Sequence, residues 1–347
     1  MQIPDVHYES RAHFLPSGFA LIWPFRNVPK EGGPYELFLD NNALANAEWL
    51  KNLEPTLRDK IVVSPMLALA EQWRSNPHFR SDAEVRIERF IEPFVESGIR
   101  FPDGYAKAQV ASLVKNEASW RSQWMLVYLY VVLLYRITKA VKGDVIPDKL
   151  LGELKYQDVP MFNGCIMLCC LASYLRSNQS TRLVGDSSAA FSYLNRFVSL
   201  HGSSKGEVEF DENYARNRAC DLFTWSAVGT LYHNGFQPAG EPVIVTQDKA
   251  LSKLIFRCFP GYLDKTGKMA FSFDERTFDS QHAARIVDCI KAVVGPVGPP
   301  VDRNEQFRRM DTLRAYGTQK AELNLAAAVN RIWDSWLKPG FQGAFRW

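Results

Sequence analysis

Acidic side chains that follow two short apolar runs are the residues of this chain best suited to chemistry. Asp40 follows the run at residues 37–39, and Asp248 follows the run at residues 243–245 after a threonine and a glutamine. Each run has the length of a buried strand and leads directly into a helical stretch. Strands that alternate with helices predict a parallel sheet, where functional groups gather at the carboxyl ends of the strands. We therefore expect Asp40 and Asp248 at one sheet edge, although either could simply cap the helix that follows it.

Two further acids lie in helical stretches with apolar neighbours. Glu71 falls within the helix expected over residues 66–74, and Asp221 falls in the middle of the helix expected over residues 213–233. A carboxylate in apolar surroundings is costly unless it is paired or bound to a metal. Aspartate is also a poor residue for a helix interior, so Asp221 needs a reason. The alternative for both acids is a salt bridge with a neighbouring arginine: Arg74, Arg216 or Arg218.

Four segments resemble, in this order, the PIN-like nuclease domain family: LFLDNNAL, VVSPMLALAEQW, NRACDLFTWSAVGTLYHNG and PVIVTQDKAL. That family places an aspartate after its first strand, a glutamate on an early helix, an aspartate on a late helix, and an aspartate after a strand that ends in threonine. By position, the resemblance implies that the metal-binding and catalytic acids are Asp40, Glu71, Asp221 and Asp248, with Asn42, Asn217 and Thr246 beside them. Ala250 stands where many relatives carry a further acid, which leaves the number of metal ions open.

The resemblance implies an α/β fold, in which a PIN-like parallel sheet flanked by helices carries a large helical insertion and a C-terminal helical appendage. It covers roughly residues 36–76 and 211–260, and the long gap between them is more than a compact PIN domain needs. The expected organisation is an N-terminal extension over residues 1–35, a nuclease domain over residues 36–78 and 211–294, a helical insertion over residues 79–210 and a C-terminal helical region over residues 301–347. Residues 1–35 are expected to be irregular, and the Gly- and Pro-rich run 295–300 is the expected linker.

Four carboxylates in one cleft repel one another, and each pair costs roughly 3 kcal/mol at about 5 Å and an effective dielectric of about 20. A hard divalent cation relieves this repulsion, and oxygen ligands suit Mg²⁺ or Mn²⁺. Such ions activate water and stabilise the leaving oxygen of a phosphodiester. The expected function is therefore a metal-dependent endonuclease that hydrolyses phosphodiester bonds, with single-stranded RNA ahead of DNA as its substrate. The expected substrate contacts are Asn42, Arg216, Asn217, Arg218, Thr246 and Lys249.

Charge and hydropathy narrow the class of protein. A net charge of +3 over 347 residues draws no polyanion to the molecule as a whole, so any surface for nucleic acid must be local. The six cysteines show neither a disulfide framework nor a zinc-ligand spacing. The longest apolar run, residues 124–135, is shorter than the roughly 20 residues that cross a bilayer. We expect a cytoplasmic protein without a membrane partner.

Several alternatives remain beside this interpretation. No glycine-rich GxGxxG turn supports a dinucleotide-binding enzyme, and Asn42 stands where a phosphatase with a nucleophilic Asp40 would carry its second acid. A non-catalytic PIN-like scaffold that binds RNA or protein is the main rival, with its acids vestigial or neutralised by arginine. A toxin or defence effector would share the nuclease chemistry, and its insertion or C-terminal helix would bind an inhibitor protein or form a homo-oligomer.

Overall fold

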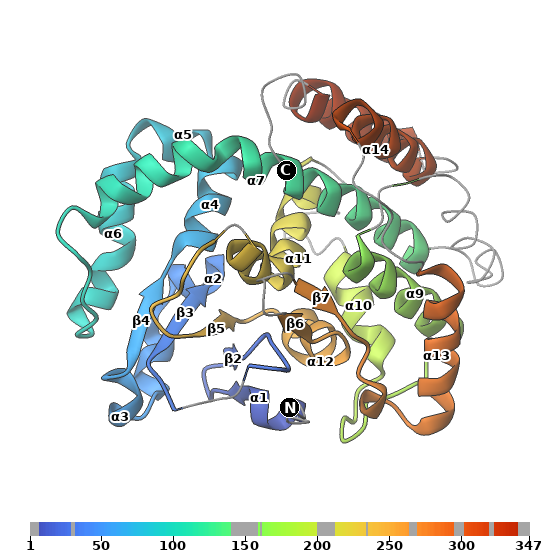
Figure 1. Cartoon of the computed structure of the whole chain (residues 1–347), viewed down its shortest axis with the longest axis horizontal. Coiled ribbons are helices and arrows are strands. Elements are labelled where there is room, and N and C mark those ends of the chain that lie inside the picture. Colours follow the sequence, from blue (N-terminus) through green and yellow to red (C-terminus); the bar gives the residue numbers. More distant parts are fainter. Residues whose placement is uncertain are drawn as a thin grey trace, which may run out of the picture. The chain divides into compact units, whose positions relative to one another are not determined.

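The computed structural model describes residues 7–28, 32–139, 159, 162–199, 212–233, 235–263, 269–294, 302–318 and 323–338 (Figure 1). The chain forms two compact units. The first comprises Met1–Glu117 with Phe223–Ser272, and the second comprises Ala118–Leu222 with Phe273–Trp347. These limits differ from the expected limits of the nuclease domain and its insertion, and that domain assignment stays a prediction.

A five-stranded sheet lies in the first unit, with strand order β1-β2-β5-β3-β4. Strand β3 (Tyr35–Leu39) pairs in parallel with β4 (Ile61–Ser64) on one side and with β5 (Glu241–Thr246) on the other. Strands β2 (Ala20–Ile22) and β1 (Ala12–Phe14) extend the sheet beyond β5 in antiparallel pairs. The predicted mixed α/β architecture with a parallel sheet is thus confirmed for the three strands β5, β3 and β4.

The two antiparallel strands correct the expectation that the N-terminal residues are irregular. All three residues of β2 are buried, because this strand pairs with β5 on one side and with β1 on the other. A strand of three residues is too short to show the alternation that identifies a strand, and prolines interrupt the surrounding sequence. Pairing across the sheet, rather than local pattern, makes these residues strands.

Gly240 fixes the start of the pairing between β3 and β5. A Cβ atom at this position would collide with the carbonyl group of Pro34, so the backbones approach here as only glycine allows. The N–H of Glu241 donates to the Pro34 carbonyl at 2.8 Å, and Tyr35 pairs with Glu241. The register of both strands begins at this contact.

Short helices surround the sheet in the first unit. Helix α2 (Asn41–Ala45) follows β3, and α4 (Met66–Ser75) follows β4 and packs against both α2 and β3. The expected helix after β5 appears as a π-helical turn, η2 (Leu251–Ile255), continued by α12 (Phe256–Cys258). The remaining elements are α1 (Tyr8–Arg11), η1 (Ala47–Asn52), α3 (Pro55–Arg58), α5 (Pro77–Ser81), α6 (Ala83–Glu96), and the hairpin of β6 (Gly261–Leu263) and β7 (Met269–Phe271).

The described part of the second unit is helical. Helix α9 (Asn163–Ser177) is buried along most of its length and packs against α10 (Ala190–Val198) and α13 (Ser280–Val293). The unit also holds η3 (Glu275–Thr277), α14 (Arg303–Thr318), α15 (Leu323–Ile332) and η4 (Trp333–Leu337). Two long helices, α7 (Tyr105–Lys139) and α11 (Glu212–His233), contribute residues to both units. The helical character predicted for residues 79–210 and 301–347 is confirmed where these regions are described, and the expected linker 295–300 lies outside the described residues.

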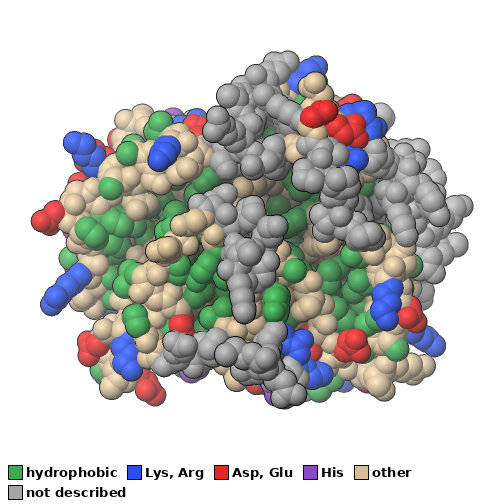
Figure 2. Space-filling view, in the orientation of Figure 1, with side chains coloured by type: hydrophobic (Ala, Val, Ile, Leu, Met, Phe, Trp, Pro, Cys, Tyr) green, Lys and Arg blue, Asp and Glu red, His purple; other side chains and the backbone are tan. Residues whose placement is uncertain are grey.

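On the face shown in Figure 2, Lys and Arg side chains are interspersed with Asp and Glu side chains rather than gathered into one basic patch. This distribution agrees with the small net charge. In the part of the chain that the structure describes, no helix has both the length and the apolar character to span a membrane.

Candidate acidic site

Asp40 and Asp248 lie at the same edge of the sheet. Strands β3 and β5 are parallel neighbours, and each is followed by one of the two acids. The backbone N–H of Asp40 donates to the Val245 carbonyl at 3.0 Å, and the N–H of Gln247 donates to Asp40 Oδ2 at 3.3 Å. The structure therefore brings together the two acids that the strand pattern placed at one edge.

Thr246, the last residue of β5, connects the two acids. Its buried hydroxyl donates to the Asp40 carboxylate and accepts a hydrogen bond from the Asp248 N–H at 3.0 Å. Burial raises the pKa of the Asp40 carboxyl, which is only 8% exposed, and the nearby Asp248 carboxylate raises it further. The hydrogen bonds from Thr246 and from the N–H groups of Ala43 and Gln247 oppose this rise. A negative charge on Asp40 is thus held where it is costly, next to a second carboxylate.

Both aspartates also cap the helices that follow them. The Ala43 N–H donates to Asp40 Oδ1 at 2.7 Å, and the Leu251 N–H donates to Asp248 Oδ1 at 2.9 Å. The capping role considered from the sequence is therefore present at both positions. It fixes the orientation of each carboxylate without consuming all of its acceptor capacity, because a carboxylate offers about four lone-pair sites.

Glu71 is tied to the residue after Asp40. The side-chain amide of Asn41 donates to Glu71 Oε1 at 2.8 Å, and its carbonyl oxygen accepts from Gln72 Nε2 at 2.9 Å. These two bonds fix the orientation of the Asn41 amide and hold a helix-borne acid beside the sheet edge. The sequence interpretation missed Asn41 and named Asn42, whose side chain is exposed. Both asparagines follow Asp40, and the chain offers no local signal for which of them turns inward.

Asp221 has a different setting from the other three acids. It belongs to the second unit, whereas Asp40, Glu71 and Asp248 belong to the first. Arg218 Nη1 lies 2.8 Å from Asp221 Oδ2, which is the arginine pairing that the sequence left open. The other predicted substrate contacts are accessible to different degrees: Asn217 and Lys249 are exposed, and Arg216 is half-buried.

Oxygen donors at the β3–β5 edge have the chemistry that a hard divalent cation prefers. Among the described residues, no group of three or more His, Cys, Asp or Glu side chains converges closely enough to hold a metal ion. The Asp40 and Asp248 carboxylates nevertheless interact electrostatically, and Asn41, the residue after Asp40, donates a hydrogen bond to Glu71. The raised pKa of Asp40 reflects a charge that a cation would stabilise. A fourth ligand from Asp221 stays a prediction.

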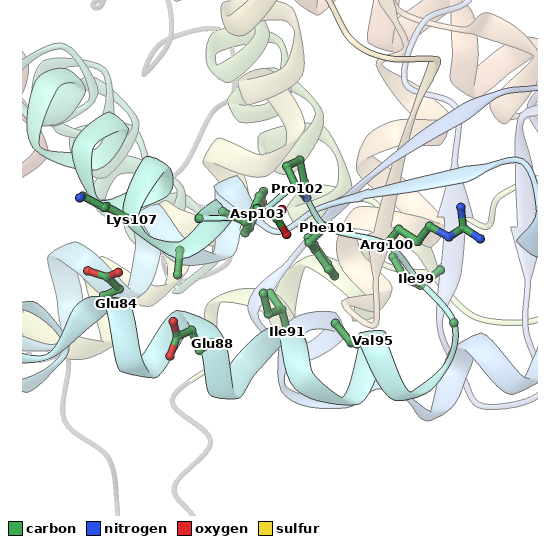
Figure 3. Close-up of a pocket in the computed structure, with 14 residues that line it drawn as sticks. Glu84, Glu88, Ile91, Val95, Ile99, Arg100, Phe101, Pro102, Asp103 and Lys107 are labelled. Carbon is green, nitrogen blue, oxygen red and sulfur yellow. The ribbon is translucent and has the colours of Figure 1, made fainter.

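A cavity of about 770 Å³ lies elsewhere in the first unit, between α6 and the start of α7 (Figure 3). Glu84, Glu88 and Lys107 lie towards one end of it, and Arg100 lies at the other. None of the predicted site residues lines this cavity. Charges of both signs around it do not define one class of ligand.

No protein-family model matches the chain, and neither a curated protein nor a solved structure is significantly similar to it. The likeness of four sequence segments to the PIN-like family therefore stays a prediction. Functional inference rests on the residues and on the geometry of the acidic edge.

Proposed function

We propose that this chain is a metal-dependent endonuclease that hydrolyses phosphodiester bonds of single-stranded RNA, ahead of DNA, at the edge formed by β3 and β5. The supporting observation is the pair of Asp40 and Asp248 at the ends of neighbouring parallel strands, joined through Thr246. Two carboxylates held this close repel each other unless a proton or a cation lies between them. Their oxygen atoms favour Mg²⁺ or Mn²⁺.

Each residue of this edge has a distinct part in the proposal. Asp40 and Asp248 would bind the cation, and Glu71 would bind it or orient the attacking water. The cation, when bound, activates water and stabilises the leaving oxygen of the phosphodiester. Thr246 fixes the Asp40 carboxylate, and the exposed Lys249 would contact a backbone phosphate next to Asp248.

Cleavage of labelled single-stranded RNA with Mn²⁺ tests this function. We expect Asp40→Ala and Asp248→Asn to lower the rate by at least about a hundredfold. Glu48→Gln serves as the control, because Glu48 is an exposed acid of the same unit paired with Lys51. Equal cleavage by the wild type and all three variants would show that the activity comes from a contaminant.

A non-catalytic scaffold that binds RNA or protein is the second candidate. The ion pair between Arg218 and Asp221 favours it, as do the capping roles of Asp40 and Asp248. Titration with Mn²⁺ separates the two candidates, because a nuclease should bind the ion and lose it on Asp40→Asn, whereas a scaffold should be indifferent. Asp221→Asn tests whether Asp221 is a further metal ligand, and weaker Mn²⁺ binding by this variant would support that role. Unchanged binding with a stability loss of about 0.2–1 kcal/mol supports an ion pair alone.

We place the protein in the cytoplasm, where it would act as an RNA-processing enzyme or as a toxin or defence effector. In the latter case, an inhibitor protein or a second copy of the chain would bind the helices within residues 79–210 or 301–347. Light scattering of the purified protein over a range of concentrations tests whether two copies of the chain associate.

A further inference from the structure

One row of residues crosses the sheet from the acidic edge to its outermost antiparallel strand. Thr246 of β5 pairs with Ala20 of β2, and Ala20 pairs with Phe14 of β1. Residues directly opposite each other on antiparallel strands point to the same face. Phe14 therefore lies two strand spacings, about 10 Å, from the threonine that contacts Asp40, and on the same face of the sheet.

Phe14 is an exposed aromatic residue beside a cation. It is the last residue of β1, at the border of the sheet, and it is 42% exposed. The ammonium group of Lys253 lies 3.6 Å from the centre of its ring. Lys253 belongs to η2, the turn that follows Asp248. An accessible ring next to a positive charge can receive a nucleobase and its phosphate together.

Basic residues continue from Asp248 along the same helical segment. Lys249, Lys253 and Arg257 recur at every fourth position, which places them along one side of this segment. Arg257 lies 3.4 Å from Glu9 and over the ring of Tyr8. These contacts hold the N-terminal segment against η2 and α12, so that Phe14 has a fixed position beside the lysines.

We propose that Phe14, Lys253 and Lys249 form a binding track for single-stranded nucleic acid that leads to the acidic edge. Phe14 stacks on a base, while Lys253 and Lys249 contact successive phosphates. An unpaired strand fits this surface, because the bases of a duplex are stacked on each other and cannot reach the ring. The role of this track in guiding a substrate rests on the proposed nuclease function. Its binding of nucleic acid can nevertheless be measured without a metal and without cleavage.

The anisotropy of a fluorescein-labelled oligouridylate of about ten nucleotides, measured in EDTA over a series of salt concentrations, tests this track. Phe14→Ala should weaken binding about 5- to 100-fold at every salt concentration without changing the slope of log K against log salt, and Phe14→Tyr should restore it. Lys253→Gln and Lys249→Gln should each reduce that slope by about 0.7, because each removes one phosphate contact.

Two matched variants serve as controls. Val62 is 41% exposed on β4, at the opposite border of the sheet, so Val62→Ala removes a comparable exposed apolar group. Lys51→Gln removes an exposed lysine that pairs with Glu48. Circular dichroism of every variant checks that the fold is retained.

Three results would overturn the track: Phe14→Ala binding as tightly as Val62→Ala, Lys253→Gln keeping the wild-type salt slope, or tighter binding of a duplex than of a single strand. Absence of binding by the wild type would also overturn it. In that case, comparing RNA cleavage by the wild type with cleavage by Asp40→Ala still tests the nuclease function independently.

Discussion

The hydroxyl of Thr246 is shared by Asp40 and Asp248: it donates to the carboxylate of the first and accepts from the backbone N–H of the second. One buried side chain at the end of β5 therefore contacts both the carboxylate of Asp40 and the backbone of Asp248. A threonine in this position is part of the candidate site rather than a strand residue alone.

Replacing Thr246 by valine keeps its shape and removes this hydroxyl. Thr246→Val should lower the free energy of unfolding by about 1–3 kcal/mol, because the buried Asp40 carboxylate and the Asp248 N–H both lose a partner. Thr246→Ser keeps the hydroxyl and should retain most of the affinity for Mn²⁺ that the valine variant loses. Urea denaturation and Mn²⁺ titration measure the two effects. Equal Mn²⁺ affinity of the valine and serine variants would show that the hydroxyl does not orient the acids.

The raised pKa of Asp40 determines how this residue affects stability with pH. Because burial favours the protonated carboxyl, the folded protein keeps a proton that the unfolded chain releases at its ordinary pKa of 3.8. The stabilising contribution is present below that pKa and is lost as the pH rises through the higher folded-state pKa. Above the folded-state pKa, the ionised Asp40 carboxylate therefore weakens the fold.

Asp40→Asn should abolish this pH-dependent loss, because asparagine is neutral and is also a good helix cap. We expect the variant to be at least as stable as the wild type at pH 7, with their difference shrinking in acid. Mn²⁺ at a hundredfold excess over its Kd should stabilise the wild type by about 2.7 kcal/mol and leave the variant unchanged. Thermal unfolding with and without Mn²⁺ measures both effects. An equal Mn²⁺ response would exclude Asp40 as a ligand.

Adjacent asparagines offer a matched pair of variants for the position of Glu71. Asn41→Ala removes the amide that donates to Glu71, whereas Asn42→Ala alters an exposed neighbour in the same turn. We expect the first to weaken Mn²⁺ binding about 10- to 100-fold and the second to leave it unchanged. The Asn41→Ala effect should disappear in a Glu71→Gln background if Asn41 acts through Glu71. An undiminished effect in that background would assign Asn41 a separate role.

Glu36 carries a second buried carboxyl, at the other end of β3. It is 5% exposed and accepts a hydrogen bond from the Ala239 N–H at 2.7 Å, and burial raises its pKa. As with Asp40, the stability linked to its proton is lost as the pH rises through the folded-state pKa. Glu36→Gln keeps the acceptor oxygen and should flatten the fall of stability between mildly acidic and alkaline pH, measured by urea denaturation. A steeper fall in the variant would contradict this.

The sequence predicts the parallel core of the fold and half of the candidate site. The apolar runs of β3, β4 and β5 each lead into a helix, and this alternation predicts parallel pairing, which brings Asp40 and Asp248 to one edge. Strands β1 and β2 escape prediction because no helix separates them and they form by antiparallel pairing along the sheet. The position of Glu71 beside Asn41, and the pairing of Asp221 with Arg218, depend on side-chain orientations that residue spacing does not fix.

Gly240, directly before the start of β5, affects the acids that lie beyond the other end of this strand. Because the backbones of β3 and β5 nearly touch at Gly240 and Pro34, any larger residue would have to push the strands apart or slide one along the other. A slip by one residue turns every side chain of a strand to the opposite face. Thr246 would then point away from Asp40, so a methyl group added directly before β5 begins would disconnect the two acids without touching either of them.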